Sequence, residues 1–137
     1  MRSRAALIVV LASLAAACGG DDGNGVTGPS NTPFTQTVTG TVSTFGWTRH
    51  PLTTSRAGQL SVRLTWTNSS ADLDLYLSPT SCTDPYASGC TFLARSDAGS
   101  GTSEQVQRTV TAGETFNVFV DSFASGPQSY SLLVTIQ

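Results

Sequence analysis

The stretch LSVRLTWTNSSADLDLYL, residues 60–77, decides the fold class. Apolar and polar residues alternate over residues 60–66, and leucines occupy every second position over residues 73–77. Alternation with period two is typical of a β-strand with one buried face. The Asn-Ser-Ser segment at 68–70 is typical of a turn. The stretch therefore predicts two strands joined by a short turn.

The same alternation recurs along the rest of the chain. It is clear over residues 116–120 and 130–136, and weaker over residues 38–42, 46–52, 91–95 and 105–110. Segments rich in Gly, Ser, Asn and Pro separate these runs, as expected for turns. About eight short strands at this spacing predict an all-β protein, folded as an antiparallel β-sandwich.

Composition limits the class of protein and of partner. The chain has 137 residues, enough for one domain, and only 12% of them are charged. All of the basic residues are arginines, and the formal net charge is -2. Binding to nucleic acid requires clustered basic residues that displace counterions, so nucleic acid is excluded as a partner.

The N-terminus predicts export. Residues 1–4 are positively charged, and the apolar run over residues 5–17 is shorter than the ~20 residues that a membrane-spanning helix needs. The run ends in small residues before Cys18, which resembles a bacterial lipoprotein signal. We therefore expect residues 1–17 to be a signal peptide and Cys18 to be lipidated, with the protein held at the bacterial cell envelope by lipid alone. An ordinary secretory signal with a chance cysteine is the alternative.

Two segments follow the signal. Residues 18–33 are dominated by Gly, Asp, Asn, Ser, Thr and Pro, and contain too little apolar surface to offset the entropy of ordering, so they are predicted to be a flexible linker. Residues 34–137 form the predicted domain, which we expect to be monomeric. Cys82 and Cys90 are predicted to form a disulfide there, because the exported compartment permits it. A thiol metal site would lack further ligands, since His50 is the only histidine.

Four segments in order resemble the bacterial pre-peptidase C-terminal (PPC) domain: ADLDLYL, LARSDAGSG, VTAGETFNVFVDSF and SYSLLVTIQ. The resemblance covers residues 59–137 well and residues 34–58 only by strand pattern. It departs at the insert that contains Cys82 and Cys90, and at Phe119, where a charged residue is more usual. It implies a secreted, jelly-roll-like sandwich that accompanies hydrolases and is not itself catalytic.

The residues favour no enzymatic chemistry. His50 precedes Pro51, and no G-x-S-x-G nucleophile motif is present. Asp72 and Asp74 share one strand face about 7 Å apart, but a glycosidase also needs an aromatic-lined cleft. We therefore expect a protein that is not an enzyme and has no organic cofactor.

Calcium is the open alternative for the aspartates. Ca²⁺ takes 6–8 oxygen ligands, and Asp72, Asp74, Asp97 and Asp121 could supply several if the loop at 96–101 folds over the strand end. The other interpretation is that Asp72 caps the turn at 68–70 and Asp74 is solvated or paired with a nearby arginine. Exposed ion pairs of that kind contribute only ~0–1 kcal/mol.

Tyr76, Phe119 and Leu133 lie on the outward parity of their strands and form a candidate binding surface. The alternative is that a further layer covers that face of the sheet. The predicted function is a lipid-anchored cell-envelope module that binds an extracellular polymer or an exported protein. A structural spacer or a folding accessory for a secreted hydrolase is the alternative, with calcium-dependent polymer binding as a third.

Overall fold

The computed structural model describes residues 32–137, and this part of the chain contains eight β-strands. Their bounds are β1 Phe34–Val42, β2 Trp47–Thr53, β3 Gly58–Trp66, β4 Leu73–Pro79, β5 Ala94–Ser96, β6 Ser103–Val110, β7 Thr115–Ser122 and β8 Gln128–Ile136. Each of the eight predicted runs overlaps one of these strands, although the run predicted at 91–95 shares only residues 94 and 95 with β5. Residues 31–137 form one compact unit, which holds all eight strands.

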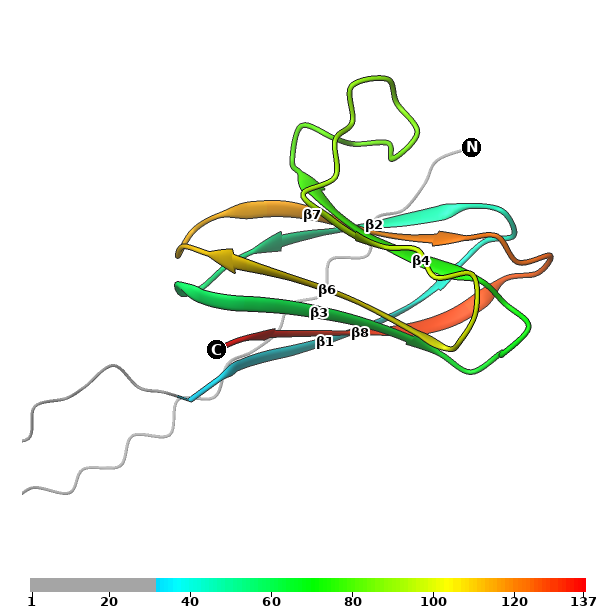
Figure 1. The fold of residues 1–137 in the computed structure, drawn as a ribbon, viewed down its shortest axis with the longest axis horizontal. Coiled ribbons are helices and arrows are strands. Elements are labelled where there is room, and N and C mark those ends of the chain that lie inside the picture. The colour runs from blue at the N-terminus through cyan, green and yellow to red at the C-terminus, as the bar shows by residue number, and fades with distance from the viewer. Residues whose placement is uncertain (1–31) are drawn as a thin grey trace, which may run out of the picture. The chain divides into compact units, whose positions relative to one another are not determined.

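The strands form two four-stranded antiparallel sheets that face each other (Figure 1). Sheet A has the order β1-β8-β3-β6, and sheet B has the order β2-β7-β4-β5. Successive strands pass from one sheet to the other, except β4 and β5, which pair within sheet B, and this is the topology of a jelly roll. The predicted all-β, jelly-roll-like antiparallel sandwich is confirmed.

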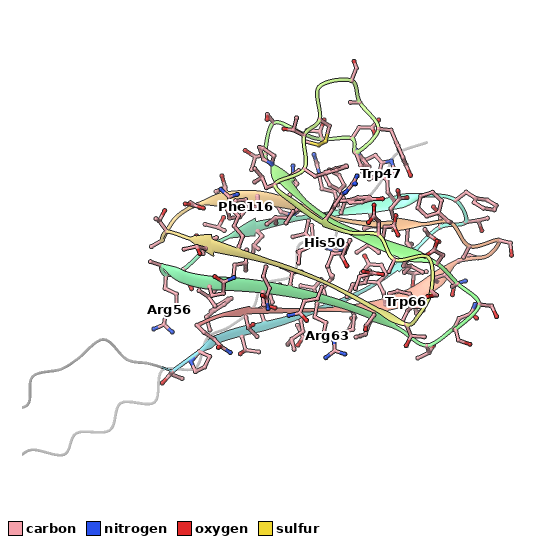
Figure 2. The ribbon with its side chains drawn as sticks, viewed as in Figure 1. Trp47, His50, Arg56, Arg63, Trp66 and Phe116 are labelled. Atoms are coloured by element: carbon pink, nitrogen blue, oxygen red, sulfur yellow. A yellow bond between two sulfur atoms is a disulfide. The ribbon has the colours of Figure 1, made fainter. Side chains whose placement is uncertain are left out.

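The alternation seen in the sequence builds the core between the sheets. Trp66 and Phe116 lie between the two layers, whereas Trp47 lies on the outside of sheet B (Figure 2). The buried residues on the inner face of sheet A are Val42, Leu60, Val62, Leu64, Trp66, Val106, Val110, Tyr130, Leu132, Val134 and Ile136. Those on the inner face of sheet B are Leu52, Leu73, Leu75, Leu77, Phe116, Val118 and Val120.

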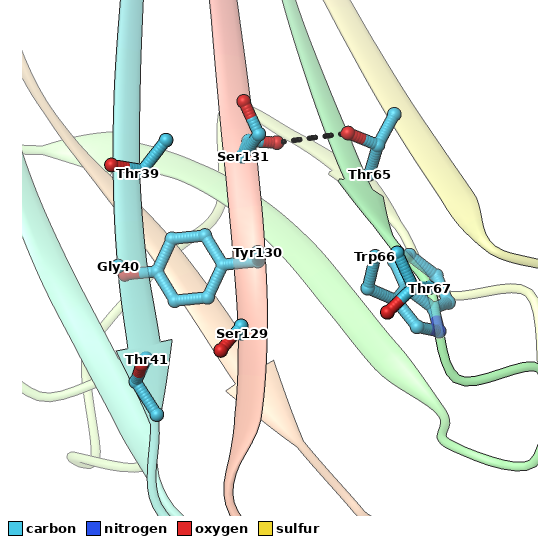
Figure 3. A pocket seen from close by; sticks show the side chains of 9 residues that line it. All are labelled: Thr39, Gly40, Thr41, Thr65, Trp66, Thr67, Ser129, Tyr130 and Ser131. Carbon is cyan, nitrogen blue, oxygen red and sulfur yellow. Dashed lines mark hydrogen bonds between the residues drawn. The ribbon is translucent and has the colours of Figure 1, made fainter.

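One glycine is required by a close approach across sheet A. Gly40 on β1 is the register partner of Tyr130 on β8, and the tyrosine ring lies over it (Figure 3). A Cβ atom at residue 40 would lie 2.6 Å from the Tyr130 hydroxyl oxygen, which is too close for any other side chain. This space lets the hydroxyl reach the Nε2 atom of His50 on β2, at 2.6 Å. The contact joins the two sheets on the side where β1 and β2 are the edge strands.

The predicted signal peptide, Cys18 and most of the predicted linker lie outside the described residues. Within residues 32–137, no helix is long and apolar enough to cross a membrane.

Candidate functional site

The outer face of sheet B is covered by another part of the chain. Residues 80–93, which we name the covering loop, leave the sheet after β4 and return to it at β5 (Figure 1). Beneath the loop, Tyr76 on β4 is 9% exposed and Phe119 on β7 is 0% exposed. The prediction that these two side chains form an exposed binding surface is wrong. Sequence parity placed them correctly on the outer face, but a second apolar layer covers them.

The covering loop is held at several points. Cys82 and Cys90 are joined by the predicted disulfide. The side-chain amide of Asn117 on β7 donates to the backbone carbonyl of Cys82 at 2.8 Å, which ties the loop to the sheet. The Tyr86 hydroxyl donates to the carboxylate of Asp121 at the end of β7. The disulfide therefore closes the loop on itself, and polar contacts attach the loop to β7 at two positions.

Aromatic rings fill the space under the covering loop. The rings of Tyr76 and Phe92 are stacked, with centroids 4.4 Å apart. Those of Trp47 and Phe119 meet edge to face at 5.5 Å. Pairs of this kind contribute about 0.5–1.5 kcal/mol beyond the area that they bury. With the disulfide, these rings form a second small core on the outside of sheet B.

The ADLDLYL aspartates do not lie on a solvated strand face. Asp74 is 7% exposed and is the cross-strand partner of Asp121, which is 1% exposed. The Tyr76 hydroxyl donates to Asp74 at 2.6 Å. Burial raises the pKa of Asp74 to about 6. The hydrogen bond from Tyr76 acts in the opposite direction and lowers this pKa, but its effect is smaller than that of burial. Burial likewise raises the pKa of Asp121, and the hydrogen bond from Tyr86 acts against this shift too.

Three of the four aspartates considered as calcium ligands have other side-chain partners in the structure. Asp97 lies 3.6 Å from the Arg95 guanidinium in an exposed ion pair, and Asp74 and Asp121 accept tyrosine hydrogen bonds. Asp72 has one buried carboxylate oxygen, Oδ1, without a hydrogen-bond partner. Among residues 32–137, no three acidic, histidine or cysteine side chains lie in an arrangement that could hold a metal ion. The structure therefore does not bring these carboxylates together as a ligand set.

Three large aromatic side chains remain exposed near the end of β7. Phe45 in the β1–β2 turn is 70% exposed, Phe123 just after β7 is 48% exposed, and Tyr86 on the covering loop is 64% exposed. The Phe45 N–H donates to the carbonyl of Ala124 at 3.3 Å, which places the two phenylalanine segments side by side. Tyr86 lies at the same end, because its hydroxyl donates to the carboxylate of Asp121 near the end of β7. We name Phe45, Tyr86 and Phe123 the aromatic end.

Phe45 is held in a costly backbone conformation. Its φ of 47° lies in the left-handed region, and no other non-glycine residue among 32–137 has a positive φ. This region is unfavourable for a bulky side chain and costs about 1–3 kcal/mol. The turn is held by the Ser122 N–H, which donates to the Gly46 carbonyl at 2.9 Å. The fold thus keeps a strained phenylalanine exposed to solvent, where a glycine would be easier to accommodate.

The outer face of sheet A has no covering loop in the described structure. One hollow, of about 650 Å³, is lined mainly by hydroxyl side chains from β1, β3 and β8 (Figure 3). Its residues are Thr39, Gly40, Thr41, Thr65, Trp66, Thr67, Ser129, Tyr130 and Ser131. Arg63 projects outward from this face (Figure 2), and its register partner Leu133 is 40% exposed on the same face, as its parity predicted. This face is polar, nearly uncharged and broad.

His50 has the environment of a structural residue. Its ring is half-buried, contacts the Tyr130 ring edge to face, and shares a hydrogen bond with the Tyr130 hydroxyl. Burial lowers the pKa of His50, so the neutral imidazole is favoured. This hydrogen bond connects His50 on β2 of sheet B with Tyr130 on β8 of sheet A.

The aromatic end could not be recognised from alternation, because its three residues lie outside the strands. Each member stands among turn-forming residues, in Ser-Thr-Phe-Gly, Asp-Pro-Tyr and Asp-Ser-Phe-Ala-Ser-Gly. A large aromatic side chain in such a turn has no core to enter. That mismatch between residue and context is the signal that could have identified the site.

No family model and no curated protein matches the chain in sequence. Solved structures do match. The mitogen from Yersinia pseudotuberculosis is 24% identical with a TM-score of 0.56, over 77% of this chain and 87% of its own. PliG of Aeromonas hydrophila, a periplasmic inhibitor of g-type lysozyme, is 18% identical with a TM-score of 0.53, over 81% and 93%.

The pre-peptidase C-terminal domain of a Bacillus anthracis collagenase also matches. It is 13% identical, with a TM-score of 0.53, over 72% of this chain and 87% of that domain. At these identities the likeness concerns the fold alone. The chain therefore has a β-sandwich fold like that of a PPC domain, in agreement with the resemblance seen in its sequence.

Proposed function

We propose that this protein is a non-catalytic, lipid-anchored module of the bacterial cell envelope that binds an exported polymer through its aromatic end. The observation that carries the proposal is Phe45, which is 70% exposed in a left-handed backbone conformation. Strain and exposure at one aromatic side chain both lower stability, and such costs are typical of functional positions.

The chemistry of the aromatic end favours a glycan chain as the partner. Exposed rings present flat apolar surfaces, which suit the C–H faces of sugar rings. Asp84, whose carboxylate accepts a hydrogen bond from the Tyr86 N–H, is exposed beside one of these rings and can also accept hydrogen bonds from hydroxyl groups of a ligand. A polyanion such as nucleic acid would be repelled by this carboxylate.

The position of the aromatic end suits a tethered protein. Phe34 and Ile136 are register partners at one end of sheet A, and Val42 and Gln128 are partners at the other end. Phe45 and Phe123 follow at the second end, so they lie at the end of the sheet opposite to Phe34, where the proposed tether joins the domain. The Cys82–Cys90 disulfide supports an oxidising, exported location. Lipid labelling of the wild-type chain and of Cys18→Ser tests the anchor, since only the wild type should carry lipid.

Co-sedimentation with insoluble glycans tests the binding site. Peptidoglycan, chitin and cellulose are the probes, and the variants are Phe45→Gly and Phe123→Ser, singly and combined. We expect the double variant to weaken binding at least about tenfold, the size of effect expected from losing two aromatic contacts. Leu133→Ser is the matched control, because it removes an exposed apolar side chain from the other face.

Phe45→Gly separates binding from folding. Glycine adopts positive φ without strain, so this variant should be as stable as the wild type, or more stable by up to ~1 kcal/mol, while it binds less well. Equal binding by the wild type and the double variant would contradict the glycan-binding proposal. That result would favour the second candidate, a spacer or folding accessory for a secreted hydrolase, which is supported only by the likeness to the collagenase domain.

A further inference from the structure

The four edge strands of the sandwich are protected to different degrees. An unprotected edge presents free N–H and C=O groups that can pair with another chain. In sheet B, β5 has only three residues, and β2 contains Pro51, which has no N–H to donate. In sheet A, β6 is tied across to sheet B, since Glu104 accepts hydrogen bonds from the Ser96 hydroxyl and, at 3.1 Å, from the Ala98 N–H.

The fourth edge, β1, has none of these protections. Its sequence is FTQTVTGTV, nine residues without a charge or a proline. All nine are paired with β8 on one side, and no other strand of the described part of the chain pairs with the opposite side. Phe34 and Val38 pack on the core but stay partly exposed at this edge. The strand therefore offers both backbone groups and apolar surface to a partner.

We propose that β1 pairs with β1 of a second copy of this chain, antiparallel and with the two-fold axis at Val38. This register aligns the whole strand, so that residue 34 lies opposite residue 42 and Val38 opposite its own copy. Sheet A would then continue through both subunits. Such a two-fold interface is closed, and the protection of the other three edges stops the sheet from growing further.

The sequence of β1 is self-complementary in this register. On the outer face, Thr35 lies opposite Thr41 of the partner subunit, and Thr37 opposite Thr39 of the partner subunit, so every outer pair is Thr–Thr. On the inner face, Phe34 lies opposite Val42 of the partner subunit, and Val38 meets its own copy. The remaining inner pair is Gln36 with Gly40 of the partner subunit, where a large side chain meets the smallest. Thr–Thr and apolar cross-strand pairs are both stabilising.

This complementarity favours a second copy over an unrelated peptide. A peptide from another protein could pair with β1 through its backbone alone. Such pairing would not explain why the residues on the two sides of Val38 match each other. The absence of charge also lets two identical strands approach without repulsion. The proposal differs from the sequence-based expectation that the domain is monomeric, because the sequence alone does not indicate which strand lies at an open edge.

Sedimentation equilibrium of residues 31–137, the compact unit with all eight strands, tests the proposal. We expect a monomer–dimer equilibrium for the wild type. Thr37→Lys/Thr39→Lys places two pairs of like charges opposite each other and should weaken the dimer at least about tenfold. Thr37→Lys/Thr39→Glu carries the same number of new charges but pairs Lys with Glu in this register, so it should still dimerise.

The matched control is Gln107→Lys/Thr109→Lys on β6, which adds the same charge to the outer face at the other edge of sheet A. This variant should dimerise as the wild type does. All four substituted side chains are exposed, and thermal unfolding shows whether each variant is folded. A wild type that stays monomeric at millimolar concentration, or a Lys/Lys variant that dimerises as well as Lys/Glu, would overturn the proposal.

Discussion

The outer faces of the two sheets follow the same strand pattern, but that of sheet B is buried under the covering loop and that of sheet A is exposed. Phe119 on β7 and Leu133 on β8 both occupy the outward parity of a central strand, but Phe119 is 0% exposed and Leu133 is 40% exposed. The difference comes from the covering loop, which brings its own aromatic ring and a disulfide to sheet B. Alternation in a sequence therefore shows which side of a sheet a residue faces, and says nothing of what lies on that side.

The largest difference in stability between the two faces is expected when these two side chains are truncated to alanine. Phe119→Ala should lower the free energy of unfolding by about 3–5 kcal/mol, because it leaves a cavity under the covering loop. Leu133→Ala should change it by less than about 0.5 kcal/mol, as is usual for a surface position. Urea denaturation of both variants measures the difference. Similar small losses would show that the covering loop is not packed on sheet B.

A smaller loss is expected when the covering loop is released. Cys82→Ser/Cys90→Ser removes the closure of a nine-residue segment, which on the chain-entropy estimate stabilises by about 2.5 kcal/mol. The same variant should expose Tyr76 to solvent, and its fluorescence and its reactivity toward nitrating reagents should then increase. A variant with lowered stability and an unreactive Tyr76 would mean that the loop stays in place without the disulfide.

The carboxyl group under the covered face should make stability depend on pH. Burial raises the pKa of Asp74 to about 6, whereas the pKa of an aspartate in the unfolded chain is about 4. Between these values the folded state keeps a proton that the unfolded state has released, so the free energy of unfolding falls as pH rises from about 4 to about 6.

In the variant Asp74→Asn, the free energy of unfolding should fall less as pH rises. The amide does not ionise but can still accept the hydrogen bond from Tyr76, so the variant should be more stable than the wild type near neutral pH. Some slope should remain, because the pKa of Asp121 is shifted in the same direction. Urea denaturation at about pH 4.5 and about pH 7 gives the comparison, and equal slopes for the two proteins would contradict it.

The smallest effect is expected from calcium. Because residues 32–137 contain no metal-binding group of carboxylates, the midpoint of thermal unfolding should be the same in millimolar Ca²⁺ and in EDTA. A ligand that binds only the folded state at ~100 times its dissociation constant adds about 2.7 kcal/mol, a shift of several degrees. A shift of that size, lost in Asp72→Asn/Asp74→Asn, would restore the calcium alternative.

Seven of the strands, the approximate position of β5 and the disulfide could be predicted from the sequence, because period-two alternation and paired cysteines are local signals. The burial of Tyr76 could not, since the residues that cover it come from a loop whose path no periodicity describes. The pairing of Asp74 with Asp121 depends on the register between β4 and β7, which is set by the whole fold. Phe45 was missed for a similar reason, because its strain is a property of the turn and not of the residue type.

The most direct test of the account is an NMR titration of residues 31–137 with soluble peptidoglycan fragments. The account predicts that backbone amide shifts concentrate at Phe45, Gly46, Phe123 and Ala124, and that Phe45→Gly/Phe123→Ser abolishes them. Shifts that concentrate instead at Thr39, Thr65 and Ser131, in the hollow on sheet A, would contradict it. That result would move the binding site from the aromatic end to the uncovered face.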